Sequence, residues 1–450
     1  MCYIGAYTKI GLGELAMSRR LSDESISARN YYLMIAEGSV FWFASSFIDG
    51  NSVISVFINE ATGSIQLAGL TATLRSCVVI VGQFLIGMWI YRIRNFDSAM
   101  HWFAFLTRPL LLLSVPLLLL GVSGTAAAVA VIVLLCLFYF SDGFVGLLWT
   151  ELGARTIPPR KRASIQGYQQ VFGGIAGLLS AVLVKAILDS PRLDFNQRYA
   201  IIFGLCGLVF ASNAVVLYFI KDLPRNRGRK VNAGQASVRS YLGNFLRLWR
   251  ADGNYRNLMG CRVLYVLATM GSSLLVLFGK GYAGLTDVQA SAMLYLQVGG
   301  QVVGGFLWAQ LCRRKGNNFQ IMFSFGVPLA IALLGAFTHF AGKTGANLVW
   351  SSGAMVLLSG MYTSAWIGIA NRVIDIVEPA ERTNYLVMQS LLQFPFTFAA
   401  YFAGLAAELW SFLPVFAAIG LCGLTGFGLS AKLYRERDRI EAKVETSKGA

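Results

Sequence analysis

Long apolar runs separated by short polar breaks recur along the whole chain. Each run has about 20 residues, which is enough for a helix to cross the hydrocarbon core of a bilayer. The strands of a membrane barrel would instead give alternating segments of about 10 residues, and the sequence lacks that alternation. The pattern predicts an all-α polytopic membrane protein.

The longest polar segment divides the apolar runs into two equal groups. Twelve transmembrane helices are predicted, at 31–57, 65–91, 99–121, 125–152, 163–189, 197–220, 257–281, 286–313, 317–340, 345–375, 382–407 and 410–432. We expect five parts: a cytoplasmic N-terminal segment at 1–30, a six-helix bundle at 31–220, a cytoplasmic linker at 221–256, a second six-helix bundle at 257–432 and a cytoplasmic tail at 433–450.

The second part of the linker has a helical pattern of its own. Tyr241, Leu242, Phe245, Leu248 and Trp249 recur at helical spacing, with arginines between them. This pattern predicts an amphipathic helix that lies on the membrane surface. A linker helix packed on the protein is the alternative.

Composition and charge agree with a membrane protein and indicate its orientation. Charged residues make up 13% of the chain, about half of the share found in soluble domains. The net charge of +16 is concentrated in one set of connections and at both ends of the chain. The positive-inside rule therefore predicts that both termini are cytoplasmic and that the protein lies in the cytoplasmic (inner) membrane. Anionic lipid headgroups, not nucleic acid, are the expected counter-charge.

No cofactor or metal is expected. The seven cysteines are scattered and the only histidines are His101 and His339, so neither a metal cluster nor a disulfide framework is indicated. No G-x-x-x-x-G-K-[ST] nucleotide-binding loop occurs, which argues against ATP as the energy source.

One segment of the first half returns in the second half. WTELGARTIPPRKRASIQGYQQ at 149–170 is echoed by IANRVIDIVEPAERTNYLVMQS at 369–390, which aligns Arg162 with Arg382. The basic loops that begin at Arg92 and Arg314 form a second matching pair. Matching loops at a nearly constant offset indicate an internal duplication in parallel orientation, so two pseudo-symmetric halves are predicted.

These features resemble a known family. The order of spans, the basic loops, the long central segment and the W-T-E-L…I-P-P-R-x-R…G segment are similar to the major facilitator superfamily over about residues 30–430. GGFLWAQLCRRKGNN (304–318) and EPAERTNYL (378–386) resemble a prokaryotic branch of it whose members mostly lack an assigned substrate. The resemblance implies a central cavity lined by spans 1, 4, 7 and 10 and by parts of spans 2, 5, 8 and 11.

The cytoplasmic signature of the family, G-x-x-x-D-R-x-G-R-R/K, is only partly present. GMWIYRIRNF (87–96) lacks the acidic residue, and an arginine replaces that residue in the second copy. Because the acidic residue normally helps to latch the cytoplasmic ends, Glu151 is expected either to replace it by pairing with Arg94 or Arg382, or to sit in interfacial water. The residues expected at this cytoplasmic gate are Arg92, Arg94, Glu151, Arg155, Arg162, Arg314 and Arg382.

Ionisable side chains at membrane depth are functional candidates by default, because their burial in lipid is unfavourable. Arg75 and Asp142 lie deepest and are the strongest candidates, with a purely structural ion pair as the alternative. Glu37 could be the buried partner of Arg262 or Arg108, and Arg262 could instead be a snorkelling anchor. The predicted coupling residues are Asp142, Asp49, Glu37, Arg75 and Arg108.

Polar and aromatic residues share the faces on which the resemblance places the cavity. They are Trp42, Ser45, Tyr139, Gln166, Gln169, Gln170, Arg262, Tyr265, Thr269, Gln297, Gln301, Tyr362, Trp366, Gln389 and Gln393. Amides that face lipid would be unfavourable, so the glutamines are expected either to line a polar path or to hold helices together.

The predicted function is secondary active transport by alternating access. The expected partners are a small organic solute and protons or another ion, and the protein is expected to be a monomer and not an enzyme. Proton coupling through Asp142, Asp49 or Glu37 is favoured, with Arg75 and Arg108 binding an anionic group or tuning the carboxylate. A lipid flippase on the same scaffold, which would need apolar cavity faces, is the main alternative. A membrane receptor or enzyme descended from a transporter is the other, although no nucleophile–base pair occurs at depth.

Overall fold

The computed structural model describes residues 4–48, 53–224, 243, 245–247, 249–250, 252–283, 285, 287–340, 346–377 and 381–448. All regular structure in these residues is helical, and helices coincide with each of the twelve predicted spans. The predicted all-α fold is therefore confirmed.

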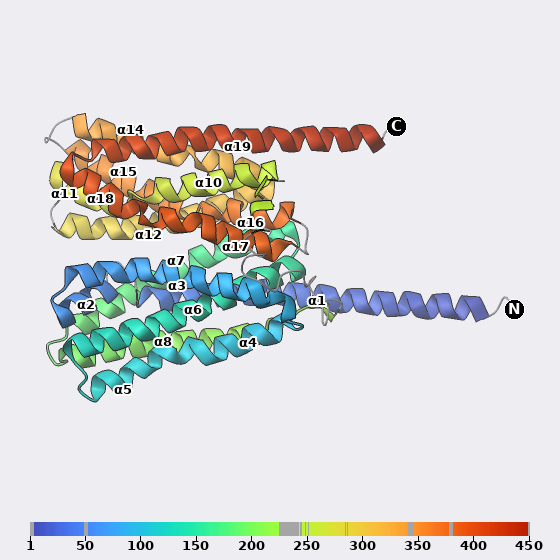
Figure 1. Ribbon diagram of the computed structural model, residues 1–450, viewed down its shortest axis with the longest axis horizontal. Coiled ribbons are helices and arrows are strands. Elements are labelled where there is room, and N and C mark those ends of the chain that lie inside the picture. The colour runs from blue at the N-terminus through green and yellow to red at the C-terminus, as the bar shows by residue number, and fades with distance from the viewer. Residues whose placement is uncertain are drawn as a thin grey trace.

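The helices form two groups that follow each other along the chain (Figure 1). The first group consists of α1 (Ile4–Ser46), α2 (Val53–Thr62), α3 (Ile65–Trp89), α4 (Phe96–Thr107), α5 (Ser114–Leu119), α6 (Gly124–Thr156), α7 (Pro159–Leu188) and α8 (Phe195–Tyr218). The second consists of α10 (Gly253–Thr269), α11 (Leu275–Ala283), α12 (Asp287–Lys315), α13 (Asn317–Ser324), α14 (Gly326–Phe340), α15 (Ala346–Thr363), α16 (Trp366–Ile376), α17 (Arg382–Gln393), α18 (Ala399–Leu409) and α19 (Leu413–Lys448).

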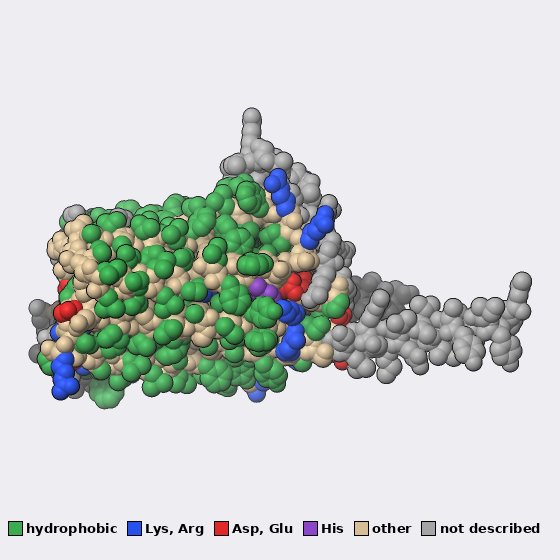
Figure 2. All heavy atoms as spheres, turned by 90° about the horizontal axis from the view of Figure 1, so that it is seen from below, with side chains coloured by type: hydrophobic (Ala, Val, Ile, Leu, Met, Phe, Trp, Pro, Cys, Tyr) green, Lys and Arg blue, Asp and Glu red, His purple; other side chains and the backbone are tan. Residues whose placement is uncertain are grey.

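Eight of the described helical segments are long and apolar enough to cross a membrane, judged by length and composition. They correspond to spans 3 to 6 and 9 to 12, namely Phe96–Leu119, Gly124–Thr156, Pro159–Leu188, Phe195–Tyr218, Asn317–Phe340, Leu348–Ile376, Arg382–Leu409 and Leu413–Arg435. The other predicted spans coincide with α1 and α2, with α3, with α10 and α11, and with α12. Figure 2 shows hydrophobic side chains over the flank of the bundle and Lys and Arg near its ends, as a lipid environment requires.

Three of the spans are broken by 3-10 turns. Pro109 and Pro395 lack an N–H for the helical ladder, and 3-10 turns at Arg108–Leu113 and Phe394–Phe398 separate α4 from α5 and α17 from α18. A third turn at Ser272–Leu274 separates α10 from α11. Irregular backbone at membrane depth occurs where it is buried in protein or lines a cavity, so polar residues near these breaks are candidates for a site.

Both chain termini lie at one end of the bundle (Figure 1). The C-terminal helix α19 continues to Lys448, and α1 begins already at Ile4. The cations predicted to be cytoplasmic gather at this end, which we call the basic end. It holds Arg92, Arg94, Arg155, Arg160–Arg162, Arg313–Lys315, Arg372 and Arg382.

The linker is described only in part, and Tyr241, Leu242 and Leu248 lie outside the described residues. The described linker residues between positions 243 and 250 are helical. Phe245 is 7% exposed and belongs to the hydrophobic core, and Trp249 packs against that core. These two contacts favour the alternative of a helix packed on the protein.

The two halves touch along α7 and α12, which lie side by side at their boundary (Figure 1). Glycines permit this close approach. A Cβ atom on Gly167 would lie 2.7 Å from the carbonyl oxygen of Gly305, and one on Gly305 would lie 2.6 Å from Cβ of Gln170. Larger residues at either position would push the two halves apart.

Candidate functional site

A partly buried ion pair lies inside the first half, at the break in the third span, with the side chains of Arg108 and Asp142 3% and 20% exposed. Nη2 of Arg108, the first residue of the 3-10 turn, is 2.9 Å from Oδ1 of Asp142 on α6. The rings of Phe41, Phe138 and Phe210 surround the guanidinium, with centroids 4.8, 5.4 and 5.6 Å from Cζ. Nε and Nη1 of Arg108 are buried without a hydrogen-bond partner in the described part of the chain. Asp142 is therefore the anchor of this guanidinium.

A second carboxylate, Glu37 on α1, is buried close to this pair. It is 5% exposed, and Nδ2 of Asn213 donates to its carbonyl oxygen over 2.7 Å and to Oε1 over 3.2 Å. Glu37 lies within electrostatic range of both Arg108 and Asp142. Since Arg108 already pairs with Asp142, ionised Glu37 leaves this group of three with one unbalanced negative charge.

The two strongest sequence candidates, Arg75 and Asp142, do not pair with each other. Asp142 is bonded to Arg108, whereas Cζ of Arg75 lies 4.6 Å above the centre of the Tyr139 ring. Depth along a span indicates how unfavourable a charge is but not which way its side chain points, and this is why the sequence ranked Arg75 above Arg108.

Of the remaining coupling candidates, Glu37 has identifiable partners in the structure, whereas Asp49 is not described. The amide of Asn213, which the sequence reasoning did not identify, bonds Glu37. Of the two arginines considered as partners of Glu37, Arg108 is the one in its electrostatic environment. Asp49 lies outside the described residues.

The interior of the second half carries an arginine held by an amide. Nε of Arg262 on α10 donates to Oε1 of Gln393 over 2.9 Å, immediately before the break in the eleventh span. The centre of the Tyr265 ring lies 5.5 Å from Cζ of Arg262 and 5.2 Å from the ring of Tyr362. Nη1 of Arg262 and the hydroxyl of Tyr362 are buried and without a hydrogen-bond partner in the described structure. This cluster can offer donors to a bound molecule.

Four of the predicted glutamines, Gln166, Gln169, Gln170 and Gln301, hold helices together. Asn371 Nδ2 donates to Oε1 of Gln166, and Gln301 Nε2 donates to Oε1 of Gln170, each over 2.6 Å and each across the two halves. Gln169 donates to a carbonyl oxygen of α1 over 2.6 Å, within the first half. The helix-binding alternative thus describes these contacts. The other predicted cavity residues are buried or half-buried in the bundle, namely Trp42, Ser45, Thr269, Gln297, Trp366 and Gln389.

At the basic end, two reciprocal ion pairs join the halves. Nη1 of Arg382 is 3.6 Å from Oε1 of Glu151, and Nη1 of Arg162 is 3.0 Å from Oδ1 of Asp375. In each pair the arginine stands near the start of span 5 or 11, and the carboxylate stands near the end of span 4 or 10 of the other half. The repeat aligns the two arginines with each other, but it does not align Glu151 with Asp375, so the duplication relates the arginines and not the carboxylates.

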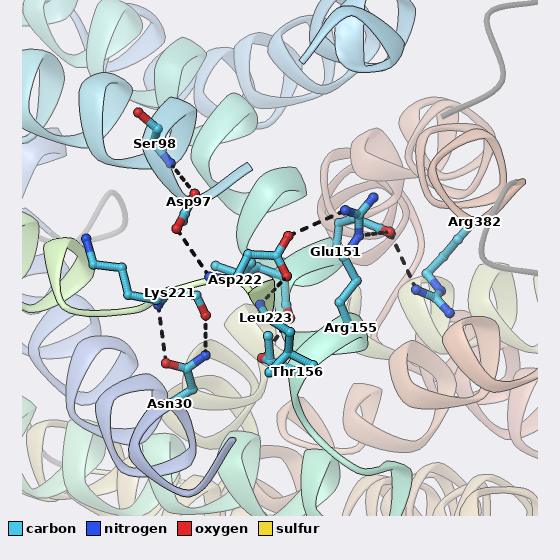
Figure 3. Close-up of polar contacts among 11 residues, drawn as sticks. Asn30, Asp97, Ser98, Glu151, Arg155, Thr156, Lys221, Asp222, Leu223 and Arg382 are labelled. Atoms are coloured by element: carbon cyan, nitrogen blue, oxygen red, sulfur yellow. Dashed lines mark hydrogen bonds and ion pairs between the residues drawn. The ribbon is translucent and has the colours of Figure 1, made fainter. Parts of the chain in front are cut away.

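We call the Arg162–Asp375 and Arg382–Glu151 pairs the latch. Glu151 connects the latch to a wider network in the first half (Figure 3). Its Oε1 accepts from Nε of Arg155 over 2.8 Å, and Nη1 of Arg155 lies 3.6 Å from Oδ2 of Asp222. The backbone N–H of Asp222 donates to Oδ2 of Asp97 over 3.3 Å. The beginning of α4, the first linker residues and the end of α6 are thus tied to Arg382 on α17.

The residues expected at the cytoplasmic gate differ in burial. Glu151 is only 1% exposed and pairs with Arg382, one of its two expected partners, so it does not sit in interfacial water. Arg92 and Arg94 are exposed, and Arg314 lines a cavity at the basic end. The sequence reasoning missed Asp375, because the repeat aligns it with Arg155 and not with Glu151.

Known proteins resemble this chain in sequence and in fold. The family model described as Major Facilitator Superfamily matches residues 38–388. No curated protein matches the sequence. The solved structure of a bacterial homologue of the iron transporter ferroportin, in an outward-facing state, is similar with a TM-score of 0.70 at 14% identity, covering 90% of this chain and 99% of that chain.

Two sugar transporters are also similar in structure. The E. coli fucose:proton symporter has a TM-score of 0.67 at 13% identity, over 90% of this chain and 98% of its own. The proton:xylose symporter XylE has a TM-score of 0.67 at 13% identity, over 92% of this chain and 96% of its own. Identities this low show the shared fold alone.

Proposed function

Because this chain belongs to the major facilitator superfamily, and is thus a multi-pass membrane transporter and not an enzyme, we propose that it is a proton-coupled secondary transporter of a small organic solute. Two of the structurally similar proteins are named as proton symporters. The observation that carries the proposal for this chain is the buried group of Glu37, Arg108 and Asp142.

Charge balance explains how this group would couple to protons. Arg108 pairs with Asp142, and Glu37 adds a second carboxylate nearby, so the group carries one negative charge when both carboxylates are ionised. An unbalanced charge is unfavourable in a buried site, and uptake of one proton removes it. Glu37 is the proton acceptor in this scheme because Asp142 is already bonded to Arg108. Glu37 would release this proton when the site faces the cytoplasm.

The basic end would be the cytoplasmic end, since the positive-inside rule assigns its cations to the cytoplasm. The Arg162–Asp375 and Arg382–Glu151 pairs and the Gln166–Asn371 bond hold the halves together there. The described arrangement would therefore be closed to the cytoplasm. Alternating access requires these contacts to break as the halves rock about the site.

The solute would contact the second half at Arg262, Tyr265 and Tyr362. Arg262 retains an unpartnered Nη1 and Tyr362 an unpartnered hydroxyl, and both can donate to solute oxygen atoms. Buried donors without partners are unfavourable, so a solute that supplies acceptors would be bound preferentially. This arrangement favours a polar solute that also has a face able to pack against the rings of Tyr265 and Tyr362.

A second candidate function, lipid flipping, is favoured by one observation. An apolar cavity of about 400 Å³ lies between α10, α18 and α19, next to the break at Pro395. Leu267, Phe396, Phe402 and Val415 are among its lining residues, which suits an acyl chain better than a polar solute.

The test begins with thermal unfolding of the purified protein against metabolites and lipids at two pH values, since a ligand of the native state raises the unfolding temperature. The best polar ligand is then tested for uptake into proteoliposomes with and without a pH gradient. We expect accumulation that requires an inward proton gradient. Stabilisation and translocation by phospholipids alone, with no polar ligand, would support the flippase, and accumulation independent of the pH gradient would exclude proton coupling.

A further inference from the structure

A cationic cavity opens at the basic end, away from the buried groups described above. Its volume is about 740 Å³, and it lies where α7 begins, where α12 is followed by α13, and beside the end of α16. The cations that line it are Arg160, Arg313, Arg314, Lys315 and Arg372. Arg160 comes from the first half, and the other four come from the second.

The local backbone explains why so many cations converge. Gly316 has a φ of +87°, a conformation that glycine adopts without strain, and it turns the chain sharply from α12 into α13. The turn places Arg313, Arg314 and Lys315 on one wall of the cavity, and all three are exposed.

The carboxylate in the cavity does not balance these charges. Among the described lining residues, Asp375 is the only acidic one. Its Oδ1 is bonded to Arg162 over 3.0 Å, and its Oδ2 accepts from Nδ2 of Asn317 over 2.8 Å. Like charges in a common hollow repel each other, and an anion that enters relieves this repulsion.

We propose that this cavity binds a phosphate-bearing anion. Arginine forks match the oxygens of phosphate, and lysine adds a point charge. The volume falls within the range of about 300–1,000 Å³ that is typical of small-molecule sites. The shared chemistry is the phosphate group, which is present both in a soluble phosphorylated compound and in an anionic lipid headgroup.

The position of the cavity gives the anion a regulatory role. An anion that contacts Arg160 and the arginines of the second half bridges the two halves beside the Arg162–Asp375 pair. It therefore stabilises the arrangement in which the basic end is closed. This role does not depend on the identity of the transported solute or on proton coupling.

The experiment compares a cavity variant with a matched surface variant. Arg313→Gln/Lys315→Gln removes two cavity cations, and Lys432→Gln/Arg435→Gln removes two exposed cations of α19 at the same end. In the first arm, detergent-purified protein is titrated with inorganic pyrophosphate at constant ionic strength, so that screening is unchanged, and the unfolding temperature is measured. In the second arm, nanodiscs of phosphatidylcholine are compared with nanodiscs that also contain phosphatidylglycerol.

We expect the phosphate-bearing anion to raise the unfolding temperature of the unaltered protein and of the α19 variant, but not that of the cavity variant. Stabilisation by pyrophosphate alone identifies a soluble phosphorylated ligand, and stabilisation by phosphatidylglycerol alone identifies a lipid headgroup. Stabilisation in neither arm, or equal losses in both variants, overturns the proposal. Arg160→Gln provides a second cavity variant from the other half. If it retains the full shift, the anion does not bridge the two halves and the regulatory role is wrong.

Discussion

The two halves of this molecule share a fold but differ in the charges that they bury. Inside the first half, Arg108 and Asp142 form an ion pair with Glu37 nearby. Inside the second half, Arg262 is held by the amide of Gln393. Asp and Glu residues of the second half occur near the ends of its predicted spans, at Asp287, Asp375, Glu378, Glu381 and Glu408. The duplication thus kept the helices while the interior chemistry diverged.

This difference suggests a division of labour. A group of opposite charges whose balance changes by one proton suits ion coupling, and a cation with an amide partner and free donors suits recognition of a polar solute. The basic end shows the opposite behaviour. There each half contributes one arginine and one carboxylate to ion pairs with the other half. Contacts from both halves are needed to hold this end closed.

The largest expected effect comes from Arg108→Gln in the first half. It leaves Asp142, whose side chain is 20% exposed, without its cation. Breaking a fully buried ion pair typically destabilises a protein by about 3–5 kcal/mol, so we expect a loss of about 3 kcal/mol or less here. Denaturation of the purified protein measures this loss. The double variant Arg108→Gln/Asp142→Asn should recover part of it, since Asp142 is then no longer a charge without its partner. If Arg262→Gln is equally destabilising, the two halves do not differ as argued.

The next effect concerns coupling and involves Glu37→Gln. The amide keeps the size of the side chain and can still contact Asn213, so the free energy of unfolding should change by no more than about 1 kcal/mol. Uptake driven by a pH gradient should fall to simple equilibration, because the group can no longer exchange a proton. Asp189→Asn, which changes an exposed carboxylate, is the matched control. Full accumulation by Glu37→Gln would move the coupling role to another residue.

A smaller effect is expected from Arg262→Gln in the second half. Hydrogen bonds to charged groups contribute about 1.5–3 kcal/mol, which corresponds to a loss of roughly 10- to 100-fold in solute affinity. The apparent KM for uptake should rise while accumulation still depends on the pH gradient. Arg262→Lys should recover little, since lysine lacks the planar fork of donors. Loss of gradient dependence in Arg262→Gln would contradict the division between the halves.

The smallest effects should come from the latch and should be unequal. Glu151 is more buried than Asp375, with side chains 2% and 22% exposed, and the contribution of an ion pair falls towards about 0–1 kcal/mol as its side chains become exposed. Arg382→Gln should therefore favour opening of the basic end more than Arg162→Gln. The rate at which an impermeant maleimide labels Ala163→Cys, a buried position of α7 at that end, reports the opening. Equal rates in the two variants would show that burial does not set the strength of the latch.

Much of the fold follows from local patterns in the sequence. The apolar runs predicted all twelve helical regions, and the Lys and Arg distribution predicted that both termini lie at one end, as they do (Figure 1). Pro109 and Pro395 mark two of the three breaks. The repeat around Arg162 and Arg382 predicted two related halves. These features depend on neighbours along the chain, so they can be recognised without three-dimensional information.

The partners of the charged residues were decided by the tertiary structure. Counting residues from a span end placed Arg75 deepest, yet Arg108 bonds Asp142 and Arg75 lies on Tyr139. The repeat identified two equivalent arginines, but Asp375 and Glu151 became their partners only when the ends of four helices met. Sequence position determines how deep a charge lies and how unfavourable its burial is. The rotation of each helix and its packing against the others determine which opposite charge it meets.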